Sequence, residues 1–259
     1  MRRLRLPRPQ ANLVWFDEVD STNELAGRLM SAWLGGEEGV LPDTVVLAGT
    51  QTAGRGRGSN TWQSPPGGLY ATWLAWFPLH ALTLVPLAAG VALADGIEEL
   101  LPSVRVGLKW PNDLHVDGRK LGGVLCQSRT REAMTWVMVG FGINVGGDPV
   151  LPEGDVIRPT SLRSLGHDGN PEETVATIAG AFPARMRSLL ETPASTIAAW
   201  KARSVHTRGE WIRLRLPAGA VEGRFAGLSE DGQLELEVNG EVRRFASGEV
   251  IQDVAQAGG

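Results

Sequence analysis

A run in which glycine alternates with arginine, Gly54-Arg55-Gly56-Arg57-Gly58, is the segment of this sequence best suited to binding an anion. Glycines let the backbone approach a ligand and turn its N–H groups toward it. Arginine offers a fork of charged donors that suits carboxylate and phosphate oxygens. The run lacks the Gly-Lys-Ser/Thr ending of a P-loop, and Ser59 stands where a dinucleotide fingerprint has its third glycine. We therefore expect another kind of anion-binding loop or, on this segment alone, a solvated surface hairpin.

Three further segments combine chemical groups with turn-forming residues. Lys109-Trp110-Pro111-Asn112-Asp113 offers a lysine for a phosphate, then an amide and a carboxylate for a ribose, a metal or an incoming amine. Gly118-Arg119-Lys120-Leu121-Gly122-Gly123 places a lysine before paired glycines in a strand, where glycine is costly unless something must come close. Gly140-Phe141-Gly142-Ile143-Asn144 ends an apolar strand on an asparagine. Each segment taken alone also fits an ordinary turn or strand end.

Hydrophobic periodicity predicts the elements that must position these segments. Strands are expected at residues 12–19, 44–48, 69–76, 104–110, 114–116, 121–127 and 135–142, and helices at residues 82–101, 171–190 and 196–202. Ser21 and Glu24 fit a capping box at the start of a helix that Gly35-Gly36 would end. Asn170 is expected to cap the helix that begins at Pro171.

After His206 the pattern changes to period two, with Asp231-Gly232 and Asn239-Gly240 as turns. Strands are expected at residues 211–216, 221–228, 233–238 and 242–246, the size and spacing of a small barrel. The predicted organisation is a tail at residues 1–12, an α+β domain at 13–205 and an all-β module at 206–259.

Composition narrows the function classes. The 259 residues are 42% hydrophobic and carry a formal charge of −4, which suits a globular protein and disfavours a general nucleic-acid binder. Cys126 is the single cysteine, so no intramolecular disulfide forms, and a cytoplasmic location is expected. We expect Cys126 to fill the core rather than act as a nucleophile. The four histidines show no metal-ligand spacing, and neither a membrane span nor a secretory signal is expected.

Five strings in the order STN, QTAGRGRG, KWPND, GRKLGG and GFGINV resemble the biotin–protein ligases. The resemblance covers about residues 13–145, and the all-β module resembles the carboxy-terminal domain of that family. It implies a class II synthetase-like catalytic domain, with a central mixed sheet and flanking helices, followed by an SH3-like barrel. It implies the type without an amino-terminal DNA-binding domain, because the STN string begins at Ser21.

The resemblance also implies roles for individual residues. Biotin would contact a set comprising Ser21, Thr22, Asn23, Gln51, Arg55, Gly56, Arg57, Lys120 and Gly123. The nucleotide would contact Arg57, Trp62, Lys109, Asn112 and Asn144, with Trp62 packed on adenine. Arg55, Lys120 and Asp113 are the expected catalytic residues, and no metal ligand is assigned. The family loop commonly continues with a second Gly-Arg pair, whereas Gly58-Ser59-Asn60-Thr61 is uncharged here, which predicts a lid with fewer cations.

The implied reaction forms biotinyl-5′-AMP from biotin and ATP, with Mg²⁺, and then transfers biotin to a lysine. The acceptor would be a biotin carboxyl carrier domain of a carboxylase. No DNA or membrane partner is expected, and a homodimer is compatible with the family. Two alternatives stay open: an enzyme like the lipoate–protein ligases, and a non-catalytic module that binds biotin or a nucleotide. A DNA-binding biotin sensor is disfavoured by the charge.

Overall fold

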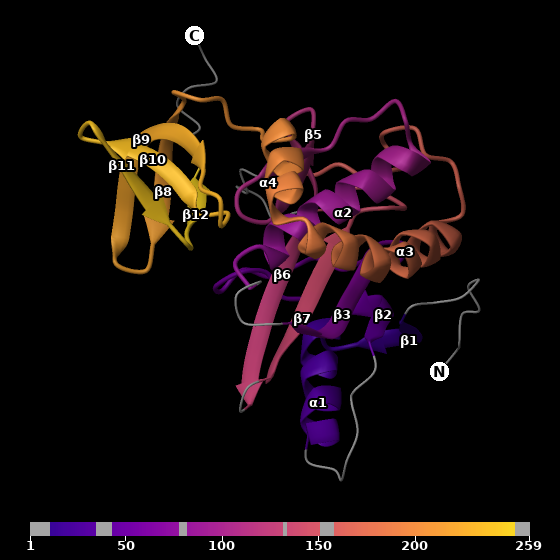
Figure 1. Cartoon of the computed structure of the whole chain (residues 1–259). Helices are drawn as coiled ribbons and strands as arrows, with labels where there is room; N and C mark the ends of the chain where they lie inside the picture. The colour runs from indigo at the N-terminus through magenta and orange to yellow at the C-terminus, as the bar shows by residue number, and fades with distance from the viewer. Residues whose placement is uncertain (1–10, 35–42, 78–81, 132–133, 151–157, 252–259) are drawn as a thin grey trace.

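A computed structural model describes residues 11–34, 43–77, 82–131, 134–150 and 158–251. Most of the predicted tail and the predicted helix end at Gly35-Gly36 lie outside these residues. Two sheets organise the described chain, a seven-stranded main sheet and a five-stranded sheet near the carboxyl end (Figure 1).

The main sheet has the order β1-β2-β3-β7-β6-β5-β4. Its strands are β1 (Asn12–Val19), β2 (Thr44–Gln51), β3 (Leu69–Phe77), β4 (Gly107–Lys109), β5 (Asp113–Val116), β6 (Arg119–Arg131) and β7 (Met134–Ile143). The β1–β2 pair is parallel and the remaining pairs are antiparallel. The sheet is thus mixed, as predicted.

Helices cover both faces of the main sheet (Figure 1). The helices are α1 (Thr22–Leu34), α2 (Val85–Leu100), α3 (Pro171–Glu191) and α4 (Pro193–Ala202). Strand β3 is buried on both faces: Trp73 belongs to the core shared with α2 and α3, whereas Leu74 packs with Met30 of α1. This two-sided burial explains why β3 reads as a continuous apolar run rather than an alternating one.

Two of the predicted helix starts have different outcomes. Asn170 caps α3, because its side chain accepts a hydrogen bond of 2.8 Å from the Glu172 backbone N–H. Ser21 stands at the predicted start of α1, where its carbonyl accepts the Leu25 N–H (2.9 Å), but the reciprocal side-chain bonds of the capping box do not form. The Ser21 N–H donates to the Asp20 carboxylate (2.8 Å), and Glu24 pairs with Arg55 instead. The partner of Glu24 lies 31 positions away in the chain, which a local pattern cannot reveal.

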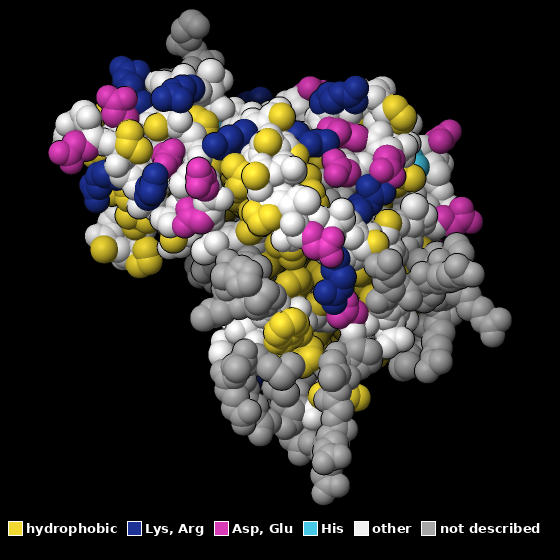
Figure 2. Space-filling model, viewed as in Figure 1, with side chains coloured by type: hydrophobic (Ala, Val, Ile, Leu, Met, Phe, Trp, Pro, Cys, Tyr) yellow, Lys and Arg dark blue, Asp and Glu magenta, His cyan; other side chains and the backbone are white. Residues whose placement is uncertain are grey.

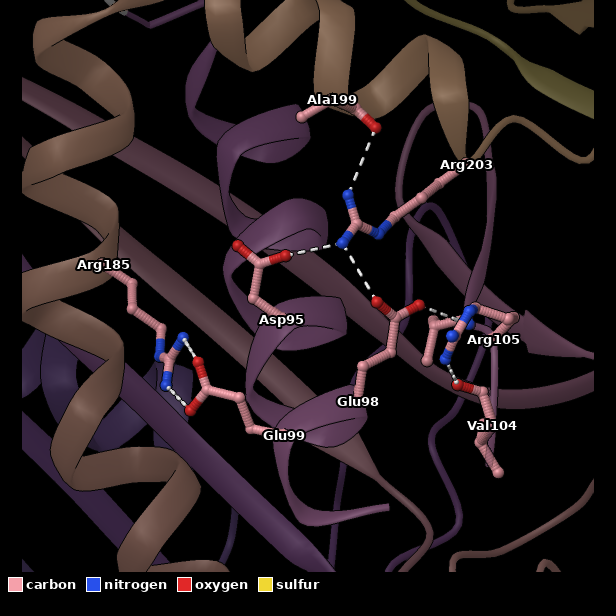
Figure 3. Close-up of polar contacts among 9 residues, drawn as sticks. Asp95, Glu98, Glu99, Val104, Arg105, Arg185, Ala199 and Arg203 are labelled. Atoms are coloured by element: carbon pink, nitrogen blue, oxygen red, sulfur yellow. Dashed lines mark hydrogen bonds and ion pairs between the residues drawn. The ribbon is translucent and has the colours of Figure 1, made fainter. Parts of the chain in front are cut away.

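Ion pairs tie the helices on one face together (Figure 3). Arg203, just after α4, contacts Asp95 (2.7 Å) and Glu98 (3.0 Å) of α2. Glu98 also accepts the Val106 backbone N–H (2.9 Å). Because the Val106 N–H bonds to a side chain, this residue does not pair with a neighbouring strand. The strand predicted at residues 104–110 is therefore observed only as Gly107–Lys109.

The second sheet, which we term the C-terminal sheet, is antiparallel with the order β11-β10-β9-β8-β12. Its strands are β8 (Trp211–Leu216), β9 (Gly219–Leu228), β10 (Leu234–Val238), β11 (Glu241–Phe245) and β12 (Glu249–Ile251). The turn Asn239-Gly240 has positive φ at both residues, as its sequence predicts. Strand β12 was not predicted, and within the described residues the pairing does not close from β11 to β12.

Surface charges of both signs are interspersed on the face shown in Figure 2. They do not form a large basic field on this face. Among the described helices, none is long and apolar enough to cross a membrane.

Candidate active site

A buried polar network joins the start of α1 to the end of β2 and the middle of β3. The Thr22 N–H donates to Gln51 Oε1 (2.8 Å), and the Thr72 hydroxyl donates to Asn23 Oδ1 (2.6 Å) while lying 2.9 Å from the Thr22 hydroxyl. Asn23 Nδ2 donates to the Leu125 carbonyl on β6 (3.2 Å). The predicted biotin residues Thr22, Asn23 and Gln51 therefore lie together, with their side chains already oriented.

Residues 54–62 form a hairpin, which we term the lid hairpin. The Gly56 N–H donates to the Asn60 carbonyl (2.8 Å), and the Trp62 N–H donates to the Gly54 carbonyl (2.9 Å). Arg55 and Thr61 face each other as an isolated antiparallel β-bridge. Gly58 has a φ of +62° at the tip. The uncharged stretch that departs from the family loop thus lies at and beyond the turn of this hairpin.

Both lid arginines have partners outside the hairpin. Arg55 pairs with Glu24 of α1 (3.0 Å), and Arg57 Nη1 donates to the Gly248 carbonyl beside β12 (2.7 Å). The first contact is half-exposed, so solvent weakens it. The second crosses to the C-terminal sheet.

Lys120 and Asp113 form an ion pair at the ends of neighbouring strands. The Nζ–Oδ2 distance is 2.8 Å, and the side chains are 19% and 23% exposed, so the pair is shielded but open to a ligand. Gly123 makes room for it, because a Cβ there would lie 3.2 Å from Asp113 Oδ1, whereas Gly122 permits the close approach of Ile143. The expectation that the paired glycines permit a close approach is confirmed here.

Lys109 lies across from Asp113 in the β4–β5 register. Burial lowers the pKa of Lys109, and the neighbouring Lys120 lowers it further, whereas Asp113 opposes this shift. The positive charges of Lys109 and Lys120 therefore lie close enough to repel each other, with Asp113 between them in the register and Glu249 also near Lys109. An added anion would relieve the repulsion between them, which is the property that a phosphate site needs.

Trp62 is the last residue of the lid hairpin, and its side chain packs on strand β7 of the main sheet. A Cβ at Gly142 would come within 2.6 Å of its indole ring, so only glycine at that position allows this packing. Lys120 Nζ lies 5.7 Å from the ring centroid. Trp62 thus adjoins the Lys120–Asp113 pair, and its place beside the nucleotide stays a prediction.

Two predicted nucleotide residues have structural contacts of their own. Asn112 Nδ2 donates to the Val124 carbonyl (2.7 Å), while the buried Asn144 Nδ2 donates to the Thr160 carbonyl (2.8 Å). The Thr160 N–H in turn donates to the Lys120 carbonyl (2.9 Å). These contacts hold the strand that carries Lys120, so both asparagines support the site through the backbone.

Glu24 and Thr72 contact site residues, and neither contact was predicted from the sequence. Thr72 sits in an apolar strand, and its polar contacts come from residues about 50 positions away. No local signal marks it. Cys126 was assigned no chemistry, and burial raises the pKa of its thiol to about 12, which disfavours a thiolate nucleophile.

Comparisons with known proteins agree with this geometry. The model of the biotin/lipoate A/B protein ligase family matches residues 20–144, and that of the biotin protein ligase C terminal domain matches residues 207–251. The chain is 34% identical to the biotin–[acetyl-CoA-carboxylase] ligase of Paracoccus denitrificans, covering 84% of this chain and 91% of that protein. It is 30% identical to the bifunctional ligase/repressor BirA of Bacillus subtilis, covering 92% and 73%.

Among solved structures, the biotin protein ligase from Aquifex aeolicus in complex with biotin and ATP is similar to this chain. The TM-score is 0.73 at 30% identity, with 93% of this chain and 97% of that chain covered.

Proposed function

The chain belongs to the biotin protein ligase family, and on that premise we propose that it activates biotin with ATP and transfers it to a lysine of a carrier protein. The observation that carries the proposal is the ion pair of Lys120 with Asp113. It adjoins Lys109 and stands beside Trp62 of the lid hairpin. This arrangement puts two cations and one carboxylate where an acyl phosphate would form.

In the first step, a biotin carboxylate oxygen attacks the α-phosphorus of ATP, and pyrophosphate leaves. Both reactants are anions, so fixed positive charge must stabilise their approach. Lys120 is proposed to contact the biotin carboxylate and the α-phosphate, with Lys109 on the phosphate. Arg55 would leave Glu24 for the carboxylate, an exchange made easy by the half-exposed contact.

The described residues fit Mg²⁺ that arrives with ATP. They hold no group of three His, Cys, Asp or Glu side chains that could cage a metal. Mg²⁺ usually needs only one or two protein carboxylates, with phosphate oxygens and water as its other ligands. Asp113 is the carboxylate we propose for it, and the bound ion would neutralise charge on the phosphates.

In the second step, the acceptor lysine amine attacks the acyl carbon, and AMP leaves. The attacking amine must lose a proton, and Asp113 is the nearest carboxylate to Lys120 that could accept it or orient the amine. Until then the lid hairpin would exclude water from the mixed anhydride.

Biotin-dependent ATP–pyrophosphate exchange tests this proposal. We expect exchange with biotin and none with lipoate. Exchange with lipoate alone would instead support an enzyme like the lipoate–protein ligases. Biotin binding without exchange would support a non-catalytic module.

We further propose the partners and the domain division of the chain. The acceptor is a biotin carboxyl carrier domain of a carboxylase, as the name of the Paracoccus denitrificans relative suggests. Residues 13–205 would form the catalytic domain and residues 206–259 the C-terminal module, in a cytoplasmic enzyme.

We also propose a homodimer. Strand β5 pairs with β6 only as far as Gly123, so the rest of that edge of β6 has no partner strand within the described residues and could pair with a second copy. Labelled-biotin transfer and sedimentation would test the acceptor and the dimer.

A further inference from the structure

The contact between the lid hairpin and the C-terminal sheet has no place in the reaction just described. Arg57 Nη1 donates to the backbone carbonyl of Gly248 at 2.7 Å, and the two residues are 191 positions apart. Arg57 is half-buried. A charged donor on a carbonyl is among the stronger hydrogen bonds in proteins, so this contact can hold the hairpin.

The Gly248 carbonyl is held in place by its own sheet. Gly248 has a φ of +148°, and a Cβ there would lie 2.7 Å from Leu214 Cδ1 and 3.1 Å from the Arg215 carbonyl. The next residues pair with β8, and Val250 and Leu214 are buried partners in that register. The carbonyl therefore presents a rigid acceptor to the hairpin.

The C-terminal sheet is also fixed to the catalytic domain at a second place. Trp110 Nε1 donates to the Gly232 carbonyl (3.3 Å), and Gly232 packs so closely on α2 that a Cβ would lie 2.6 Å from Leu87 Cδ1. Trp110 is buried, and it follows Lys109 directly in the chain. The sheet thus has a defined position relative to the lysines.

A guanidinium group can bind the carbonyl and a ligand at once. It carries five N–H donors in a planar fork, and the Gly248 carbonyl uses one of them. The remaining donors can face an acyl-phosphate oxygen, in an orientation that the carbonyl sets. The C-terminal sheet would then act on the reaction without touching the substrate.

We propose that the Gly248 carbonyl positions Arg57, so that retention of the acyl-adenylate under the lid hairpin depends on the docked C-terminal sheet. The inference rests on the proposed function for the identity of the retained intermediate. The contact itself does not, and it can be tested in the ligand-free protein.

The first experiment is limited trypsin digestion of the ligand-free full chain, which reports access to the bond after Arg57. Gly248→Ala should displace the carbonyl because of its strained φ and the contact with Leu214. Gly240→Ala is the matched control, since Gly240 has a φ of +82° in the same sheet and nothing lies within 4 Å of its Cβ position. We expect cleavage after Arg57 to be roughly tenfold faster in Gly248→Ala, as for the loss of one hydrogen bond to a charged group, and unchanged in Gly240→Ala.

The second experiment measures release of labelled biotinyl-AMP during a chase with unlabelled substrates. We expect roughly tenfold faster release from Arg57→Ala and from Gly248→Ala. The double variant should release no faster than Arg57→Ala alone, because both changes remove the same contact. A purely structural role of the sheet would instead make the two effects multiply.

Multiplied effects, or a folded Gly248→Ala variant with normal cleavage and release, would overturn the proposal. If Gly248→Ala does not fold, Gly232→Ala decides the matter, because its Cβ would lie 2.6 Å from Leu87 Cδ1 and would push the C-terminal sheet away from α2 while leaving the hairpin sequence unchanged. Normal trypsin cleavage and normal release in Gly232→Ala would then refute the coupling. If the unaltered chain shows no biotin-dependent ATP–pyrophosphate exchange but the trypsin result is as expected, the proposed function is refuted while the Arg57–Gly248 contact is supported.

Discussion

Replacing Lys120 with alanine removes one cation from the proposed reaction centre and leaves the backbone in place. The Lys120 N–H donates to the Arg158 carbonyl (2.7 Å), and its carbonyl accepts from Thr160 (2.9 Å). The side chain contacts Asp113 and the Trp62 ring. The change is therefore local, and its effects on chemistry and on stability can be separated.

Two magnitudes follow from these contacts. Loss of one preorganised donor to a developing charge costs about 3–4 kcal/mol, so adenylate formation should slow by roughly 10²–10³-fold. Asp113 also loses its partner. Because the pair is about one-fifth exposed, we expect a loss of about 1–2 kcal/mol in the free energy of unfolding, between the values for surface and buried pairs.

Single-turnover pyrophosphate release at saturating biotin and ATP measures the chemical effect, and urea unfolding measures the stability effect. The sequence has three lysines, and Lys201 is exposed on α4, so Lys201→Ala is the matched control. The double variant Lys120→Ala with Asp113→Asn removes the unpaired charge. It should recover stability without recovering the rate.

Pyrophosphate release within twofold of the unaltered enzyme would refute the role of Lys120. So would recovery of the rate in the double variant, because the defect would then come from the stranded carboxylate rather than from the missing cation.

Three further results are expected. Trp62 fluorescence should change when ATP and biotin are added together, since the ring adjoins Lys120, and Trp62→Phe should remove that component of the signal; a flat titration would count against adenine packing. Asp113→Asn should slow pyrophosphate release, because the carboxylate proposed for Mg²⁺ is lost, and should also slow biotin transfer, because the proposed proton acceptor is lost. Raising the Mg²⁺ concentration should restore only pyrophosphate release, and equal recovery of both steps would exclude a role specific to transfer. Burial lowers the pKa of His115 from 6.5 to about 4, so between these values the unfolded chain binds a proton that the native chain does not, and stability falls as pH falls. The free energy of unfolding should drop by about 2 kcal/mol more between pH 7 and pH 5 in the unaltered protein than in His115→Gln, and equal slopes in urea unfolding at the two pH values would contradict the assignment.

Local sequence determined most of the elements because their signals are local. The alternation from Trp211 predicted β8 at its observed bounds, and Asn170 before Pro171 predicted the start of α3. Asp117-Gly118 joins β5 to the strand that carries Lys120, and both residues have the positive φ that an Asp-Gly pair readily adopts in a hairpin turn. Five ordered strings were enough for the family resemblance, which the comparisons confirmed.

The contact that holds the lid hairpin in place could not be predicted from the local sequence. The absent second Gly-Arg pair predicted a lid with fewer cations, but it did not reveal what holds the hairpin in place. The backbone carbonyl of Gly248 holds the hairpin by accepting a hydrogen bond from Arg57. Every residue has a backbone carbonyl, so no residue type in the sequence indicates this partner.

The sequence by itself thus determined the reaction class and the residue types that serve it. The order of these residues along the chain and their backbone preferences can be recognised within short segments of sequence. Only the tertiary structure decided which partner each charge has. Lys120 meets Asp113 across two strands, Arg55 meets Glu24, and Arg57 reaches the C-terminal sheet. Side-chain pairing of this kind depends on how distant elements pack, and packing is a property of the whole fold.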